Sequence, residues 1–168
     1  MAIQPLFDLS RIDLSATRAD RAQICARIPH RDQMLLIDRI IWADESTMSG
    51  VGERVIREDE FWTSGHFPEA PVLPGVLMIE SAAQLGCWIW MGAVEDPRTL
   101  GLVRVDDVAL RGSAEPGDTL LFMAKGVRWN HKRMIVRNQA VKRDNPKHVI
   151  FEATITGMPL RNGAADSA

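Results

Sequence analysis

The longest apolar stretch of the chain covers residues 70–94 and predicts one long buried helix. Glu80 is the only Asp, Glu, Lys or Arg within it. We expect the helix to begin near Pro74, because proline is acceptable in a first turn, to continue through Trp90 or beyond, and to stop before Pro97. The prolines, the carboxylate and the polar flanks argue against a membrane span, and an apolar helix is equally typical of a soluble protein's core.

The other apolar positions predict strands. Runs rich in Val, Ile, Leu, Phe and Thr, bounded by turn residues, cover residues 34–42, 47–57, 100–110, 119–129, 132–143 and 148–157. Short turns with Pro, Gly, Asn and Asp join the last four, which favours antiparallel neighbours. Gly50 and Gly52 suggest bulges or strong curvature in the second strand. One apolar helix beside about six strands predicts an α+β fold in which a curved antiparallel sheet wraps around the helix.

The two ends of the chain have a different character. The first 20 or so residues are expected to be weakly structured and, with charges every few residues, do not resemble a secretory signal. Residues 15–27 predict a short amphipathic helix that Pro29 ends. Residues 159–168 are polar and small and are predicted to be disordered. We therefore expect a single domain over residues 1–158, with a helical extension over residues 1–28.

Composition narrows the partners and the compartment. The 168 residues carry a formal net charge of −2, which gives no reason to expect nucleic acid or an anionic membrane as a partner. Cys25 and Cys87 show neither a disulfide framework nor zinc-ligand spacing. The cysteines therefore favour a reducing compartment, which we take to be the cytoplasm.

The candidate chemistry centres on His66 and Glu80. A lone carboxylate in an apolar helix must be neutralised or find a partner, and burial that raises its pKa would let it hold a proton and act as a general acid. His66 could supply the complementary base. The alternatives are a structural histidine and a buried carboxyl satisfied by backbone groups. His30 is interpreted as a structural residue before the first strand, and His131 and His148 as solvated turn residues.

The sequence around the two candidates carries a family resemblance. Residues 65–84 read GHFPEAPVLPGVLMIESAAQ, residues 28–31 read IPHR and precede LLIDR, and Val-Asp at 105–106 precedes Pro-Gly-Asp at 116–118. These landmarks resemble the FabZ-type (3R)-hydroxyacyl-[acyl-carrier-protein] dehydratases, which have a hotdog fold. A glutamate at position 80 resembles the FabZ branch rather than the FabA branch. The resemblance implies elimination of water from a β-hydroxyacyl thioester, without a metal or an organic cofactor.

The resemblance also implies roles for individual residues. His66 would take the C2 proton, oriented by the backbone carbonyl of Val72, and Glu80 would protonate the leaving C3 hydroxyl. The N–H of Gly75, unpaired at a helix start, can bind the thioester carbonyl. Gln84 lies one turn beyond Glu80 and can hydrogen-bond its carboxyl. Because the family's histidine and carboxylate come from different subunits, a homodimer, or a trimer of dimers, is implied, with acyl carrier protein as partner.

Some positions depart from the family pattern. Asp32, Gln33 and Met34 replace an aromatic residue followed by Pro-Phe, only Arg111 remains of an F-R-R-P motif, and the chain has no tyrosine to form a tunnel gate. These departures leave open the acyl-chain length and the pathway, which could be fatty-acid, polyketide or specialised lipid synthesis. A hotdog thioesterase and a non-catalytic subunit that binds acyl carriers are the alternatives.

Overall fold

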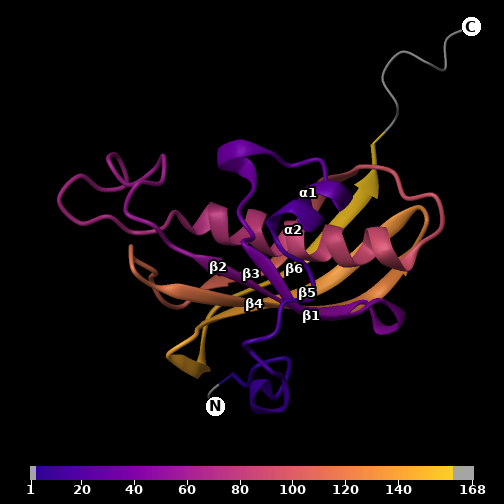
Figure 1. Cartoon of the computed structure of the whole chain (residues 1–168), viewed down its shortest axis with the longest axis horizontal. Helices are drawn as coiled ribbons and strands as arrows, with labels where there is room; N and C mark the ends of the chain where they lie inside the picture. Colours follow the sequence, from indigo (N-terminus) through magenta and orange to yellow (C-terminus); the bar gives the residue numbers. More distant parts are fainter. Residues whose placement is uncertain (1–2, 161–168) are drawn as a thin grey trace, which may run out of the picture.

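The computed structural model describes residues 3–160, which form one six-stranded sheet around one long helix (Figure 1). The strands lie in the order β1-β2-β4-β5-β6-β3, and all neighbours are antiparallel. Their bounds are β1 Arg39–Asp44, β2 Ser49–Val55, β3 Leu100–Leu110, β4 Thr119–Asn130, β5 Arg133–Lys142 and β6 Asn145–Pro159. The predicted α+β hotdog class is confirmed.

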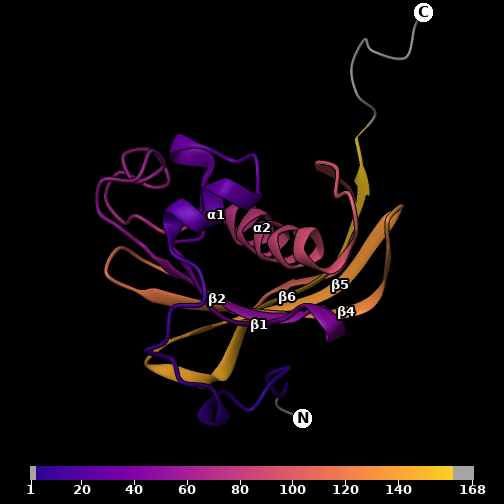
Figure 2. The same cartoon turned by 45° about the vertical axis from the view of Figure 1, so that its right-hand side comes forward.

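The long helix α2 (Gly75–Ala93) lies in the curve of the sheet, as the view turned by 45° shows (Figure 2). Residues 84–90 of the helix are all buried, and the indole N–H of Trp90 donates to the carbonyl of Asn130 at 3.0 Å. The helix has the length and composition of a membrane span, yet 56% of its apolar window is buried inside this fold. Its apolar surface is therefore the core of the domain, as predicted from its all-round apolar character.

Two glycines in β2 set the distance between the helix and the sheet. A Cβ atom on Gly50 would lie 2.7 Å from Cδ1 of Ile89, and one on Gly52 would lie 3.3 Å from Cδ1 of Leu85. The bulge suggested by these glycines occurs in the paired strand β1, where the register shifts between Ile40 and Trp42. The glycines themselves allow α2 to pack closely on the sheet.

Two strand predictions need correction at their ends. The first strand does not begin at residue 34, because Asp32–Met34 forms the 3₁₀ helix η2 and the strand starts only at Arg39. The last strand begins at Asn145 inside the predicted turn and continues to Pro159, so the disordered tail does not start at 159. Residues 161–168 of that tail lie outside the described residues.

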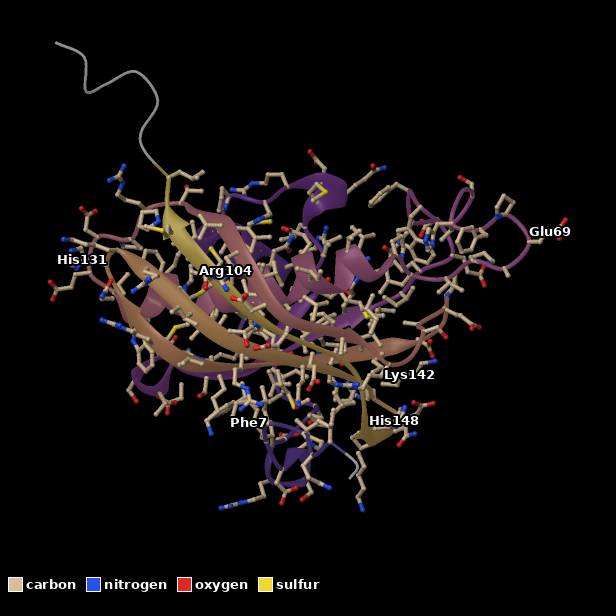
Figure 3. The ribbon with its side chains drawn as sticks, turned by 180° about the vertical axis from the view of Figure 1, so that it is seen from behind. Phe7, Glu69, Arg104, His131, Lys142 and His148 are labelled. Carbon is tan, nitrogen blue, oxygen red and sulfur yellow. The ribbon has the colours of Figure 1, made fainter. Side chains whose placement is uncertain are left out.

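The N-terminal segment is less helical than predicted. Its helices are η1 (Leu9–Arg11) and α1 (Arg21–Arg27), and a further 3₁₀ helix, η3 (Glu45–Thr47), follows β1. The α1 helix cannot start at residue 15, because Asp20 caps its N-terminus and Ala19 bridges to Ile40 of β1. Apart from η1 and the bridge at Ala19, residues 3–20 contain little regular secondary structure, as expected. Residues 3–14 cover the convex face of the sheet, where Phe7 meets Trp42 edge to face at 5.7 Å, whereas α1 lies on the same side of the sheet as α2 (Figures 2 and 3).

Candidate active site

The first candidate residue, His66, lies on the loop of residues 56–74 between β2 and α2. A buried charged network anchors this loop. Arg54, with 1% of its surface exposed, donates to Ser81 Oγ of α2 at 2.9 Å and to Glu60 Oε2 at 2.5 Å. Glu60 Oε2 also accepts from the indole N–H of Trp62, whose carbonyl accepts the backbone N–H of His66 at 2.8 Å. The backbone of His66 is thus tied to the sheet and the helix.

The imidazole of His66 has one defined partner. Its Nδ1 lies 2.6 Å from the carbonyl oxygen of Val72, and the N–H of Val72 donates back to the His66 carbonyl at 2.8 Å. A carbonyl can only accept, so Nδ1 carries the hydrogen and Nε2 of the neutral ring keeps a free lone pair. The ring stacks on Phe67, which is 55% exposed. The contact between His66 and Val72 that the family resemblance implied is therefore present.

Gly75 is the first residue of α2, and its N–H donates to no partner within residues 3–160. Pro74 precedes it with an extended backbone, so the helix starts abruptly. A Cβ atom at this position would overlap the side chain of Leu110, at the end of β3. The start of α2 therefore offers the N–H of Gly75, without a partner among the described residues, at a residue that has no side chain. Such an N–H group can donate a hydrogen bond to a negatively charged oxygen of a substrate.

Glu80 and Gln84 share one face of α2. The amide nitrogen of Gln84 donates to Oε1 of Glu80 at 2.9 Å, as the spacing of four residues predicted. The same amide also donates to the carbonyl of Met34 at 2.7 Å and accepts the N–H of Leu36 at 2.9 Å. Gln84 is only 1% exposed. Its hydrogen bonds join α2 to residues 34–36, where the sequence had predicted the start of the first strand.

Sequence reasoning missed one residue of this site. His30, interpreted as structural, places Nε2 3.3 Å from Oε1 of Glu80. The place of His30 in the IPHR motif was the only feature of the sequence that could have pointed to this role. His30 and Glu80 are fifty positions apart, and local patterns do not predict a contact over such a separation. His30 also overturns the expected direction of titration. The contact with His30 is the largest cause that lowers the pKa of Glu80; burial opposes it, and Gln84 lowers it further, so this pKa lies below, not above, its ordinary value.

A small cavity of about 50 Å³ adjoins the carboxyl of Glu80. Its lining comes from α2, from three strands and from His30, and it includes Cys87, Leu100, Leu102 and Met134. Burial raises the pKa of the Cys87 thiol to about 12, so it is a neutral part of the wall. Among residues 3–160, no group of three or more His, Cys, Asp or Glu side chains is arranged to hold a metal ion.

The two candidate catalytic residues do not meet within one chain. His66 contacts Val72 and Phe67, and Glu80 contacts His30 and Gln84, and no hydrogen bond or ion pair in the described part of the chain joins the two groups. The cavity beside Glu80 likewise does not include His66. Each chain therefore presents the two halves of a candidate site at separate places.

Similar proteins place this chain in a family. The FabA-like domain model matches residues 28–154. A 3-hydroxyacyl-[acyl-carrier-protein] dehydratase FabZ of Caulobacter vibrioides is 34% identical over 152 residues, which cover 88% of this chain and 92% of that protein. One of Xanthomonas oryzae pv. oryzae is 39% identical over 106 residues, covering 61% and 69%. The chain matches only 25% of the length of a larger relative, the bifunctional enzyme LpxC/FabZ of Bacteroides thetaiotaomicron, at 35% identity over 70% of this chain.

Solved structures agree on the fold. The dehydratase heterocomplex ApeI:P of Xenorhabdus doucetiae matches with a TM-score of 0.67 at 16% identity, covering 83% of this chain and 91% of that one. A putative thioesterase of Ralstonia eutropha matches with a TM-score of 0.57 at 15% identity, covering 71% and 82%. At such identities the likeness shows the fold alone. The family model and the FabZ relatives go further, and they show that this chain belongs to the FabA-like family of hotdog proteins, as a FabZ-type member.

Proposed function

We propose that the protein removes water from (3R)-3-hydroxyacyl thioesters carried on acyl carrier protein and releases trans-2-enoyl thioesters. Membership of the family, with FabZ relatives 34%, 38% and 39% identical, makes the chain an enzyme of the 3-hydroxyacyl-[acyl-carrier-protein] dehydratase class. The observation that carries the residue assignment is the bond of His66 Nδ1 to the Val72 carbonyl, because it leaves Nε2 as a fixed acceptor for a proton.

The three groups in the proposal act on different atoms of the substrate. His66 Nε2 takes the proton from C2, and the electron pair of that C–H bond forms the C2–C3 double bond. Glu80 gives its proton to the C3 hydroxyl, so the C3–O bond breaks and its electron pair leaves with water. The N–H of Gly75 donates to the thioester oxygen, where negative charge develops as the C2 proton departs. No group outside the protein and substrate is needed to balance the reaction.

A homodimer, alone or in a trimer of dimers, is part of the proposal. Because His66 and Glu80 are not joined within one chain, a second copy would supply the missing half of each site. The edge strand β3 supports this arrangement. It exposes four large apolar side chains by 44–54%: Leu102, Val103, Val108 and Leu110. An uncovered apolar edge strand is a template for pairing with another chain.

To act as the acid, Glu80 needs a higher pKa than it has in a single chain. The pKa of this carboxyl is lowered by its two side-chain neighbours, although burial already works against them. Covering the cavity with a partner subunit and an acyl chain would exclude more water and raise the pKa toward the range of a general acid. The proposed acid therefore takes its proton in the assembled, substrate-bound enzyme.

The proposal is tested with (3R)-3-hydroxyacyl thioesters of several chain lengths, each offered on acyl carrier protein and on coenzyme A. Mass spectrometry should detect the loss of one water from the intact thioester, and the preferred chain length and carrier follow from the rates. Release of free hydroxy acid would instead identify a thioesterase. Binding without any turnover would identify a non-catalytic subunit, and either result would overturn the proposal. We continue to predict that the protein is located in the cytoplasm.

A further inference from the structure

The carboxyl group of Glu80 is held asymmetrically. Its two side-chain neighbours lie nearest the same oxygen: Gln84 Nε2 donates to Oε1 at 2.9 Å, and His30 Nε2 lies 3.3 Å from Oε1. The other oxygen, Oε2, makes no hydrogen bond to any residue of the described part of the chain. The side chains of Glu80 and His30 are each only 24% exposed, so solvent competes weakly for these contacts.

The orientation of the Gln84 amide is settled by its backbone partners. The N–H of Leu36 can only donate, so it faces the amide oxygen, and the carbonyl of Met34 can only accept, so it faces the amide nitrogen. Gln84 therefore presents a donor, not an acceptor, to Glu80.

The tautomer of His30 follows from its second nitrogen. Nδ1 is buried and has no hydrogen-bond partner among residues 3–160. A hydrogen on Nδ1 would be a buried donor without an acceptor, which costs roughly 1–3 kcal/mol. The hydrogen of the neutral ring is therefore on Nε2, the nitrogen that lies 3.3 Å from Oε1 of Glu80. At 3.3 Å this contact is longer than a typical N–H···O bond, and bonds of this kind in active sites often tighten only when substrate is present.

We propose that His30 is a positioning residue for Glu80: with Gln84 it occupies Oε1 as a hydrogen-bond donor, so that Oε2 is the oxygen that holds the proton and faces the substrate hydroxyl. This inference rests on the proposed role of Glu80 as the acid. The proposal gives His30 a role that is separate from those of the base, the acid and the oxyanion donor.

The arrangement has a direct chemical consequence. When the proton passes from Oε2 to the C3 hydroxyl, the negative charge left on Glu80 is already met by two donors at Oε1. The donors thus stabilise the carboxylate that the reaction forms, and their presence in the free chain explains why the pKa of Glu80 is lowered.

Few other titratable groups surround this pair. Among the residues lining the cavity beside Glu80, those from β3, β5 and β6 are apolar or glycine, and Cys87 is a neutral thiol. Arg31 is adjacent in sequence, but its guanidinium donates to the carbonyls of Ile28 and His30. A change in the titration of Glu80 after substitution of His30 would therefore report on His30 itself.

The test compares His30→Leu, which removes the donor, with His30→Gln, whose amide nitrogen restores a donor but cannot titrate. His148→Gln, at an exposed histidine of β6, is the control for loss of a histidine (Figure 3). The Glu80 carboxyl carbon is followed by ¹³C NMR in the substrate-free protein over a pH series, and its signal is assigned with Glu80→Gln. The pH dependence of kcat is measured on the same proteins.

His30→Leu should raise the pKa of Glu80 in the NMR titration, move the alkaline fall of kcat to higher pH and lower maximal kcat roughly 10- to 100-fold. His30→Gln should recover most of each change, and His148→Gln should show none. An unchanged titration in His30→Leu would overturn the proposal, as would a downward shift or a His30→Gln protein that behaves like His30→Leu.

The NMR readout needs no turnover, so it separates this proposal from the proposed function. If the parent protein fails to dehydrate any thioester, the function fails while the Glu80 titration still decides the role of His30 as a donor. If His30→Leu does not fold, His30→Ala removes the same donor with a smaller side chain, and the same shifts are expected.

Discussion

The two halves of the candidate site are built in different ways. His66 lies on a loop, its ring stacks on an exposed phenylalanine, and one backbone carbonyl fixes it. Glu80 lies inside the buried helix and is held by two side chains that are themselves far apart in sequence. The proposed base thus has one ring nitrogen without a partner in the described part of the chain, whereas the proposed acid has both side-chain neighbours at one oxygen. This difference suits a base that must reach a C–H bond and an acid that must aim a single proton.

The largest expected effect is on the base side. His66→Ala removes the proton acceptor while leaving the loop anchored through Trp62, so the dehydration rate should fall by about 10²–10⁴ with an unchanged melting temperature. His131→Ala is the matched control, because His131 is exposed and lies at the opposite end of the molecule from Glu69, the tip of the His66 loop (Figure 3). Dehydration near the parental rate in His66→Ala would remove His66 from the mechanism.

The acid side should be nearly as sensitive. Glu80→Gln keeps the shape of the side chain but cannot donate a proton to the leaving hydroxyl, so kcat should fall by a factor comparable to that for His66→Ala. Substrate should still bind, because the substitution leaves the residues that contact the acyl chain and the Gly75 N–H, which binds the thioester oxygen, unchanged. Binding is measured by titration with a hydroxyacyl thioester. A Glu80→Gln protein with parental kcat would show that Glu80 is only a structural carboxyl.

Substitution of Arg54, which anchors the loop that carries His66, should lower the stability of the protein. Arg54→Met removes a buried guanidinium and leaves Glu60 and Ser81 without their partner, which should lower the free energy of unfolding by about 3–5 kcal/mol. Arg57→Met is the control, because Arg57 is 50% exposed and its pair with Asp38 should contribute at most about 1 kcal/mol. Denaturant unfolding measures both. Equal losses in the two variants would contradict the anchoring role of Arg54.

The smallest effect concerns pH and stability. The pKa of Glu80 is lowered from 4.5 on folding, so the carboxylate stabilises the fold above that pH, and this stabilisation is lost as pH falls through the folded value. The free energy of unfolding should therefore fall less steeply below pH 4.5 in Glu80→Gln than in the parent. Glu69→Gln, at the exposed loop tip, controls for the loss of a carboxyl. Identical slopes in parent and Glu80→Gln would contradict the lowered pKa.

The same contrast explains what the sequence could predict. Local signals were sufficient for α2, which starts directly after Pro74, for β3, whose bounds of Leu100–Leu110 match the prediction, and for the spacing of Glu80 and Gln84. Contacts between distant segments left no such signal. Periodicity did not reveal that His30 would reach Glu80, so the direction of the Glu80 pKa was predicted wrongly.

The same limit applies to the elements that were misplaced. The 34–42 run looked like a strand, but its first backbone groups bond the side chain of Gln84 rather than another strand. The helix expected from residue 15 starts at Arg21, because Ala19 pairs with β1. In both cases a tertiary contact overrides a local preference. The position of a second copy of the chain, which the proposed meeting of His66 and Glu80 requires, lies beyond what one chain's local pattern can specify.

The central claim is that His66 and Glu80 act together across two subunits, and subunit complementation tests it most directly. His66→Ala and Glu80→Gln chains, each inactive alone, are coexpressed in equal amounts. In a mixed dimer, one site contains both intact residues and the other contains neither. Random pairing should therefore restore about a quarter of the parental activity. Activity no higher than that of either variant alone would contradict the shared site.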